Sequence, residues 1–168
     1  VYTIDVSCSG MAGTFGLKRE MVPMASFMPD NATNVPVSSA VPDQKRPYFL
    51  FVGRLEMFKG LQDVIPCFGA DSPADLLIAG TGDFEPQLRS LANGRETVKF
   101  LGSVAPAELS GLYRSAIALI APSLCYEVFP MVALEAFREA TPIIARDLGP
   151  YRQIVEESGA GMLFTDEP

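Results

Sequence analysis

The chain has 168 residues, 48% of them hydrophobic, and its 13 basic and 20 acidic residues give a formal net charge of −7. A chain of this length can bury about 70% of the surface that it exposes when unfolded, while the acidic balance argues against a nucleic-acid partner. The absence of histidine excludes a serine or cysteine nucleophile that an imidazole base activates.

The cysteines and the apolar runs indicate the class of protein. Cys8, Cys67 and Cys125 lie far apart in the sequence, with no Cys-x-x-Cys pair, so we expect reduced thiols and no metal site. The longest apolar runs, 48–52 and 116–121, are too short to span a bilayer, and the first residues lack a signal-peptide pattern. We therefore expect a cytoplasmic chain without a transmembrane segment, and leave open a peripheral membrane contact in a longer protein.

The first 46 residues differ in pattern from the rest. Residues 1–30 contain strand-like segments and a glycine-rich turn but no start signal. Residues 31–46 mix prolines with asparagine, serine and glutamine, which predicts an extended linker. From residue 47 the pattern becomes regular, so we expect one packed domain over 47–168.

Strand and helix patterns alternate through this domain. We predict strands at 48–52, 75–79, 98–101, 117–121, 142–145 and 161–164. We predict helices at 61–68, 83–92, 107–115 and 151–157, and a central helix that opens at Phe129 and Pro130. Such alternation predicts an α/β fold, a Rossmann-like parallel sheet with helices on both faces. Ligands of these sheets bind at the carboxyl ends of the strands, so the loops that follow the strands are the candidate sites.

The loop after the first strand carries two cations between glycines. Arg54 follows Gly53, and Lys59, five positions later, precedes Gly60. A guanidinium fork and an ammonium point charge together suit a diphosphate. The alternative is a pair of surface cations, one of them bridged to Glu56.

The loop after the second strand is Gly80-Thr81-Gly82. Glycines at this place allow a ligand to approach the backbone closely. The loop lacks the third glycine of the dinucleotide fingerprint, so a nicotinamide cofactor is not favoured. An ordinary turn explains these two glycines equally well, and the same alternatives hold for the tight turn at 147–150.

Two carboxylates flank the start of the central helix. Glu127 lies in the loop and Glu135, eight positions later, lies on the helix. At about 100° per residue both can face one ligand, and a carboxylate accepts two hydrogen bonds, which suits the adjacent hydroxyls of a sugar or a ribose. The alternative is a solvated Glu127 and a Glu135 that caps the helix or pairs with Arg138.

Several segments together resemble the group 1 family of nucleotide-sugar glycosyltransferases (glycosyltransferase family 4). The segments are 51–54 with 59–60, 77–82, 100–102, 122–123, 127–130, 134–136 and 141–142. In order and spacing they are similar to the donor-binding, C-terminal half of that family over 47–164. The resemblance implies a GT-B architecture, in which two Rossmann-like domains face a cleft, and a retaining transfer of a hexosyl group from a nucleotide-diphosphate sugar in carbohydrate biosynthesis.

The resemblance also implies roles for individual residues. Arg54 and Lys59 would hold the donor diphosphate and offset the charge that builds on it, and Glu127 would contact the donor sugar, which makes these three the catalytic residues. Glu135 would bind the ribose hydroxyls, and Val104 would lie near the base. The full donor-binding set is Gly53, Arg54, Lys59, Gly80, Gly82, Val104, Glu127, Val128, Phe129, Met131 and Glu135. No metal and no further cofactor is implied.

The chain departs from the family pattern at Val128, Ala140 and Pro150, where glycine is usual. Residues 1–30 resemble the tail of an N-terminal domain and the segment that crosses from it, and 47–168 resembles a donor domain truncated at its C-terminus. The acceptor, a sugar, lipid or small molecule, would be held by that N-terminal domain, so this fragment alone is expected to be inactive. The alternatives are a non-catalytic nucleotide-binding or interaction module of the same fold, and a phosphorylase or epimerase with two such domains.

Overall fold

The structure is a computed structural model that describes residues 44–127 and 130–165. The predicted segment at 1–30 and most of the linker at 31–46 lie outside the described residues, as do Val128 and Phe129.

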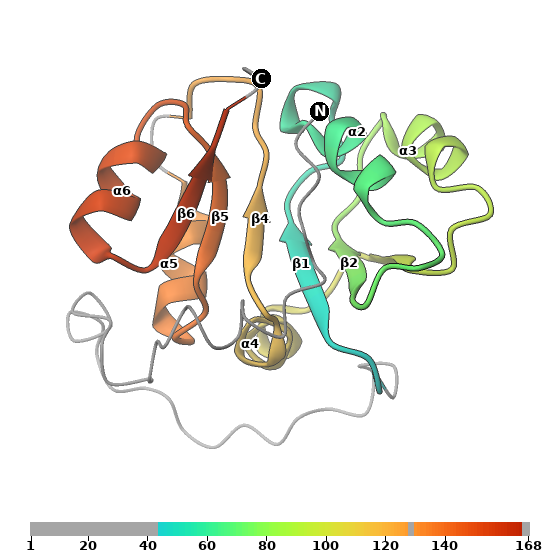
Figure 1. Cartoon of the computed structure of the whole chain (residues 1–168), viewed down its shortest axis with the longest axis horizontal. Coiled ribbons are helices and arrows are strands. Elements are labelled where there is room, and N and C mark those ends of the chain that lie inside the picture. Colours follow the sequence, from blue (N-terminus) through green and yellow to red (C-terminus); the bar gives the residue numbers. More distant parts are fainter. Residues whose placement is uncertain (1–43, 128–129, 166–168) are drawn as a thin grey trace.

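In the residues that the structure describes, six parallel strands form one sheet in the order β3-β2-β1-β4-β5-β6 (Figure 1). The strands are β1 Tyr48–Val52, β2 Asp75–Ala79, β3 Val98–Gly102, β4 Leu119–Ala121, β5 Ile143–Arg146 and β6 Gly161–Phe164. Every adjacent pair is parallel, which confirms the α/β prediction.

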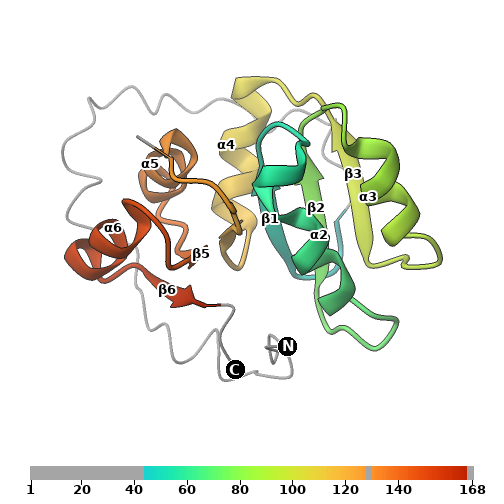
Figure 2. The same ribbon diagram turned by 90° about the horizontal axis from the view of Figure 1, so that it is seen from above.

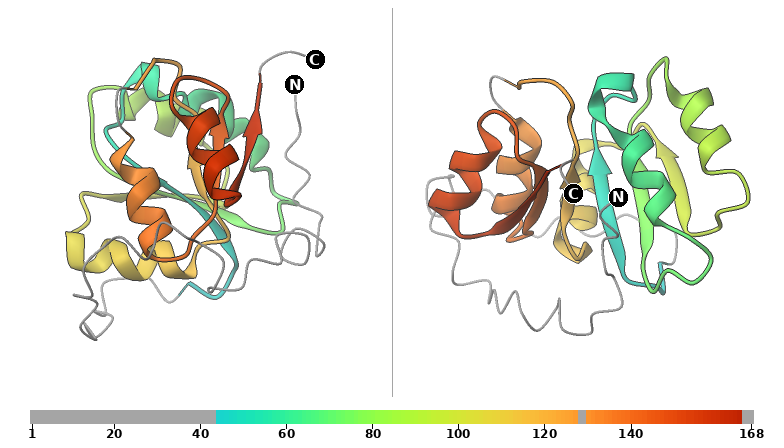
Figure 3. Two further views of the ribbon diagram at one scale, coloured as in Figure 1. Left: turned by 90° about the vertical axis from the view of Figure 1, so that its left-hand side faces the viewer. Right: turned by 45° about the horizontal axis from the view of Figure 1, so that its top comes forward.

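The connections between the strands are helical. The α-helices are α2 Leu61–Val64, α3 Glu85–Leu91, α4 Pro106–Ser115, α5 Met131–Arg138 and α6 Tyr151–Ser158, with 3₁₀ turns at Met57–Lys59 and Ile65–Cys67. Helices α2 and α3 lie on the side of β1 and β2, and α5 and α6 on the side of β5 and β6 (Figure 1). Helix α6 lies beside β6, which follows it (Figure 3).

The strands are apolar on both faces, because helices cover both. In β1, Tyr48 and Leu50 face one core with side chains of α4, α5 and α6, whereas Phe49 and Phe51 face the other with side chains of α2 and α3. The same alternation continues through β2, β4 and β5. Seen from above, α4 and α5 lie on one side of the strands and α2 on the other (Figure 2). Successive strand residues point to opposite faces, so two separate cores are the direct result of this pattern.

Several predicted bounds differ from the observed ones by one or two residues, and α5 begins at Met131, with Pro130 as the residue before it. Two further elements differ for reasons visible in the sequence or the structure. The predicted helix at 61–68 is an α-helix only to Val64 and then tightens into a 3₁₀ turn that contains Pro66. Proline lacks the N–H that would bond the carbonyl one turn earlier, so the α-helix ends there. The predicted strand at 117–121 is a strand only from Leu119, although the Ile117 amide already bonds the Tyr48 carbonyl oxygen at 2.8 Å.

The chain changes direction across the sheet between β1 and β4. From β1 it adds β2 and then β3 on one side, and it then returns to place β4, β5 and β6 on the other. This is a topological switch point, where the loops at the carboxyl ends diverge and leave a crevice. The carboxyl ends of β1 and β4 lie together at the top of Figure 1.

Candidate functional site

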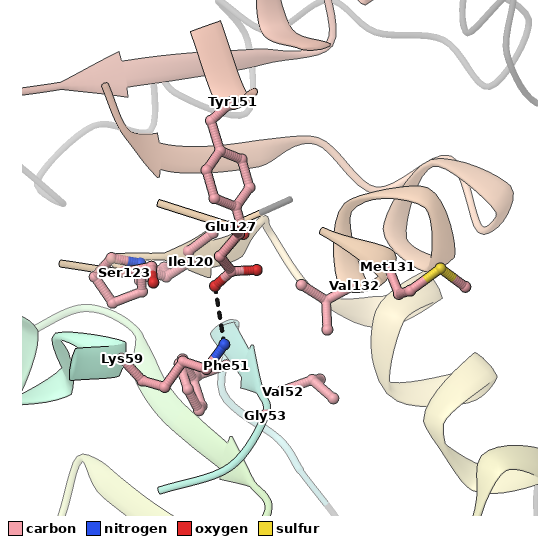
Figure 4. Close-up of a pocket in the computed structure, with 12 residues that line it drawn as sticks. Phe51, Val52, Gly53, Lys59, Ile120, Ser123, Glu127, Met131, Val132 and Tyr151 are labelled. Atoms are coloured by element: carbon pink, nitrogen blue, oxygen red, sulfur yellow. Dashed lines mark hydrogen bonds and ion pairs between the residues drawn. The ribbon is translucent and has the colours of Figure 1, made fainter. Parts of the chain in front are cut away.

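A pocket of about 220 Å³ lies at this switch point. Its floor consists of the ends of β1 and β4, residues 51–53 and 120–123. Lys59, Glu127 and Tyr151 line it as well, and the first turn of α5 contributes Met131 and Val132. We call this the Lys59 pocket (Figure 4).

Lys59 and Glu127 form an ion pair inside this pocket. The Lys59 Nζ donates to the Glu127 Oε1 at 2.9 Å, and the two side chains are 24% and 17% exposed. Water is partly excluded from both groups, so the attraction is stronger than it would be on an open surface. Figure 4 shows the pair across the middle of the pocket.

Two loops hold this pair in place. The turn that carries Lys59 is bonded to the loop that carries Glu127, because the Leu124 amide donates to the Phe58 carbonyl oxygen at 2.7 Å. The Ser123 hydroxyl donates to the same carbonyl oxygen at 3.4 Å. The loops after β1 and β4 therefore form one wall, although they are more than 60 residues apart in sequence.

Tyr151 is a pocket residue that the sequence did not reveal. It is the first residue of α6 and is 2% exposed, and its ring points from α6 toward Glu127 (Figure 4). Burial, and then the negative charge of Glu127, raise the pKa of its hydroxyl, so Tyr151 is neutral at pH 7. Nothing in the sequence pattern of an amphipathic helix distinguishes a tyrosine that lines a site from a core tyrosine.

A second pocket, of about 320 Å³, lies on the other side of the end of β1. We call it the Gly80 pocket, and its lining comprises Val52, Gly53, Arg54, Ala79, Gly80, Thr81, Ser103, Val104 and Leu109. Val52 and Gly53 line both pockets, so the two adjoin at the end of β1. The predicted site residues Arg54, Gly80 and Val104 thus lie together, and Ser103 and Leu109 were not predicted.

Arg54 has an internal partner at the rim of the Gly80 pocket. Its guanidinium pairs with Glu56 at 2.5 Å, and its side chain is 77% exposed. The pairing with Glu56 was the alternative considered from sequence. Such an exposed pair contributes little to stability, so the guanidinium is able to turn toward a ligand.

Gly80 and Gly82 are required by the packing of two loops. A Cβ on Gly80 would collide with the Gly53 carbonyl, and one on Gly82 would lie 2.7 Å from the Leu55 backbone nitrogen. The loops are joined by a hydrogen bond from the Leu55 amide to the Thr81 carbonyl oxygen at 2.9 Å. Gly80 lines a pocket, Gly82 lines neither, and close approach of protein backbone accounts for both glycines.

Glu135 lies on α5 outside the linings of both pockets. Its Oε2 accepts a hydrogen bond from the buried Tyr113 hydroxyl at 2.8 Å. Burial, and then this hydrogen bond, raise the pKa of Tyr113. Within the described residues, the partner of Glu135 is thus Tyr113 and not the Arg138 considered from sequence. Tyr113 is one turn along α4 from Leu109, and Glu135 is one turn along α5 from Met131, so the bond lies just beyond the two pockets.

The remaining site predictions divide by what the structure describes. Met131 lines the Lys59 pocket and Val104 the Gly80 pocket, whereas Val128 and Phe129 lie outside the described residues. In 44–127 and 130–165, no group of histidine, cysteine, aspartate and glutamate side chains has the arrangement of a metal site. The helices in these ranges are all too short or too polar to cross a membrane.

Comparison with curated proteins gives consistent matches. The chain is 37% identical over 123 residues to a phosphatidyl-myo-inositol mannosyltransferase of Mycobacterium leprae, covering 68% of this chain and 32% of that protein. It is 38% identical over 119 residues to an uncharacterised glycosyltransferase of Methanocaldococcus jannaschii, covering 67% of this chain and 30% of that protein. The chain thus spans about a third of the length of these relatives.

Solved structures share the fold. Sucrose-phosphate synthase from Thermosynechococcus elongatus matches with a TM-score of 0.64 and 26% identity, over 76% of this chain and 34% of that one. Anabaena HepE in complex with UDP-glucose matches with a TM-score of 0.65 and 24% identity, over 72% of this chain and 35% of that one. Residues 38–167 match the family described as glycosyl transferases group 1. This match covers most of the chain, which therefore belongs to the group 1 glycosyl transferases.

Proposed function

We propose that this chain is the donor-binding part of a retaining hexosyltransferase and holds a nucleotide-diphosphate sugar across the two pockets. The acceptor would be held by another domain of a longer protein, as the short coverage of the relatives suggests. The base of the nucleotide would lie in the Gly80 pocket near Val104, and the sugar in the Lys59 pocket near Glu127. A diphosphate between them would pass over Gly53.

The observation that carries this proposal is the adjacency of the two pockets at the switch point. They meet at Val52 and Gly53, and each has a cation in its lining, Lys59 in one and Arg54 in the other. A ligand with a planar base at one end, a polyhydroxyl group at the other and anionic charge between them matches this order. Open α/β sheets bind such ligands at this place. The HepE structure shows that the same fold occurs in a protein solved with UDP-glucose.

The chemistry requires charge stabilisation. As the bond between the anomeric carbon and the diphosphate oxygen breaks, its electron pair moves onto the diphosphate, where Lys59 and Arg54 offset the new charge. The acceptor hydroxyl oxygen bonds to the same carbon, and its proton passes to the departing diphosphate. Because Glu127 is already paired with Lys59, the leaving group itself is the base that we assign. No metal or further cofactor enters this scheme.

Calorimetric titration tests the donor site. The chain is titrated with UDP, GDP and ADP and with UDP-glucose and GDP-mannose, and the titrations are repeated on Lys59→Met. We expect one base to be preferred and the variant to bind the nucleoside diphosphate about 10- to 100-fold more weakly, because a hydrogen bond between charged groups is worth about 1.5–3 kcal/mol. Binding of the matching monophosphate should change less.

Lys45→Met is the matched control, because it removes the same charge from an exposed position ahead of β1. A folded chain that binds none of these nucleotides, or a Lys59→Met variant that binds them as the parent does, would refute the donor site. Retention is tested separately on the full-length protein, by NMR assignment of the anomeric configuration of its product.

A further inference from the structure

Tyr151 differs from the other buried tyrosines in the part of the chain that the structure describes. The Tyr48 hydroxyl donates to the Leu112 carbonyl oxygen at 2.9 Å, and the Tyr113 hydroxyl donates to Glu135 at 2.8 Å. Tyr151 is as deeply buried, at 2% exposed, yet within the described residues its hydroxyl has no hydrogen-bond partner. Its hydroxyl end lies in the Lys59 pocket beside Glu127 (Figure 4).

The Tyr151 oxygen is not sealed from the pocket, because among the described residues the buried side-chain nitrogen or oxygen atom that lacks a partner is Gln62 Oε1. The residue as a whole is buried, so the pocket is where its hydroxyl can find a partner. The hydroxyl is therefore available to the occupant of the pocket. Its neighbour Glu127 is a carboxylate, which only accepts hydrogen bonds.

We propose that the Tyr151 hydroxyl binds a hydroxyl of the transferred sugar, and that Tyr151 and Glu127 together determine which sugar is accepted. This proposal rests on the donor site described under the proposed function. A sugar hydroxyl both donates and accepts, so it can donate to Glu127 while it accepts from Tyr151. Such a site discriminates against a sugar that lacks this hydroxyl, because Tyr151 then has no partner and Glu127 keeps only its bond to Lys59.

The charges around Tyr151 favour a sugar hydroxyl over a phosphate oxygen. The adjacent Glu127 repels anions, and Lys59, which would attract the diphosphate, is on the far side of this carboxylate (Figure 4). Burial keeps the phenol neutral at pH 7, so that it remains a donor. Tyr151 thus completes the polar end of the pocket that is furthest from the cations.

The test compares the parent with Tyr151→Phe in calorimetric titrations with the nucleoside diphosphate and the nucleotide sugar that the parent binds, from the pairs UDP with UDP-glucose and GDP with GDP-mannose. We expect Tyr151→Phe to bind the nucleotide sugar roughly tenfold more weakly, since one hydrogen bond is lost, and to bind the diphosphate unchanged. A series of 2-, 3-, 4- and 6-deoxy sugars then identifies the contact, because the parent should discriminate against one of them and the variant should not.

Thermal unfolding separates this role from a structural one. Tyr151→Phe breaks no internal hydrogen bond within the described residues, so its melting temperature should equal or exceed that of the parent. Tyr48→Phe is the matched control, because it loses the bond to Leu112 and should melt earlier with an unchanged preference for the sugar.

Four results would overturn the proposal. Equal affinity of parent and Tyr151→Phe for the nucleotide sugar refutes the contact while the donor site stands. Equal weakening for diphosphate and nucleotide sugar, or an earlier melting of Tyr151→Phe, shows that the tyrosine supports the pocket and does not recognise the sugar. A parent that binds no nucleotide refutes the donor site and this inference together.

Discussion

At the scale of single residues, the central feature of the site is that its cation already has a partner. Lys59 donates to Glu127 at 2.9 Å within a pocket that partly excludes water. The pair is formally neutral, so the Lys59 pocket presents less positive charge than its lysine suggests. A diphosphate bound as we propose would share Lys59 with a carboxylate that repels it.

This competition predicts an unusual effect of Glu127→Gln. The variant removes the negative charge and releases Lys59, so we expect it to bind the nucleoside diphosphate several-fold more tightly than the parent. The variant also loses a carboxylate that accepts hydrogen bonds from the sugar. The nucleotide sugar should therefore gain less affinity over the nucleoside diphosphate in the variant than in the parent. Calorimetric titration with UDP or GDP and with the corresponding nucleotide sugar measures both effects.

Glu85→Gln is the control for this prediction. Glu85 forms an ion pair with Arg89 on α3, at 2.7 Å, and lines neither pocket, so its loss should leave both affinities unchanged. Weaker binding of the diphosphate by Glu127→Gln would contradict the prediction, because it would mean that Glu127 orients Lys59 for the ligand and does not compete with it.

The sequence predicted these residues unevenly, and the reason is physical. Lys59 and Glu127 each follow a strand end, and parallel strands bring their carboxyl ends to one edge, so their proximity follows from topology. Tyr151 begins a helix after a Gly-Pro turn, and no local pattern reveals that its ring reaches the loop after β4. The hydrogen bond of Glu135 depends on how α4 packs on α5, which spacing along one helix does not give.

At the scale of elements, the loops after β1 and β2 support each other through their glycines. The Phe84 amide bonds the Leu55 carbonyl oxygen at 3.0 Å, and the Leu55 amide bonds the Thr81 carbonyl oxygen at 2.9 Å. Backbone approaches backbone here, and Gly82 leaves no space for a side chain. The conformation of residues 53–55, which include pocket-lining positions, thus depends on the loop after β2.

Gly82→Ala should therefore destabilise the chain. The new Cβ would lie 2.7 Å from the Leu55 nitrogen, and because backbone cannot yield as a flexible side chain does, we expect a loss of about 1–3 kcal/mol in the free energy of unfolding. Urea denaturation measures the loss. Gly69→Ala is the control, since a Cβ at that position would have open space within 4 Å, and it should change stability by less than about 1 kcal/mol.

If Gly82→Ala were as stable as the parent, the two loops would not be packed as described.

The glycines also show what the sequence could not settle. It placed Gly80 and Gly82 beside a site, but a glycine that admits a ligand and a glycine that admits another loop look the same in sequence. The strands were predicted more closely, with β1, β2 and β6 at their observed bounds, because glycine or a polar turn ends an apolar run sharply.

At the scale of the whole molecule, the two ends of the strands have different roles. The two pockets lie at the carboxyl ends, whereas Asp75, the first residue of β2, makes its contacts at the amino ends. This carboxylate pairs with Lys99 at 2.7 Å and Arg46 at 3.1 Å and accepts a hydrogen bond from Gln44 at 2.8 Å. It is 1% exposed, so these partners stabilise it in a place where water cannot.

These contacts make the stability of the fold depend on pH. Burial is the largest single influence on the pKa of Asp75 and raises it, but the hydrogen bonds from Lys99 and Gln44 and the charges of Lys99 and Arg46 together outweigh burial and leave the pKa lowered. A group whose pKa is lower in the folded chain stabilises the fold above its unfolded pKa, near 3.8, and loses that contribution as the pH falls through its folded pKa. The contribution of Asp75 is thus complete at pH 7 and declines below about pH 4.

Asp75→Asn tests whether the charge of Asp75 stabilises the fold at the amino ends of the strands. At pH 7 the free energy of unfolding of the variant should be about 1–3 kcal/mol lower than that of the parent, since the variant loses hydrogen bonds between charged groups. The deficit should shrink below about pH 4, because the unfolded parent then takes up a proton that the folded carboxylate resists, and the contribution of Asp75 declines. Urea denaturation at pH 7, 5, 4 and 3 follows this, with Asp71→Asn, which removes an exposed charge, expected to keep the pH dependence of the parent. A deficit for Asp75→Asn that stays constant down to pH 3 would mean that Asp75 acts through its shape and not its charge. Nucleotide affinity at pH 7 should match that of the parent, because the substitution lies at the far end of the strands from both pockets.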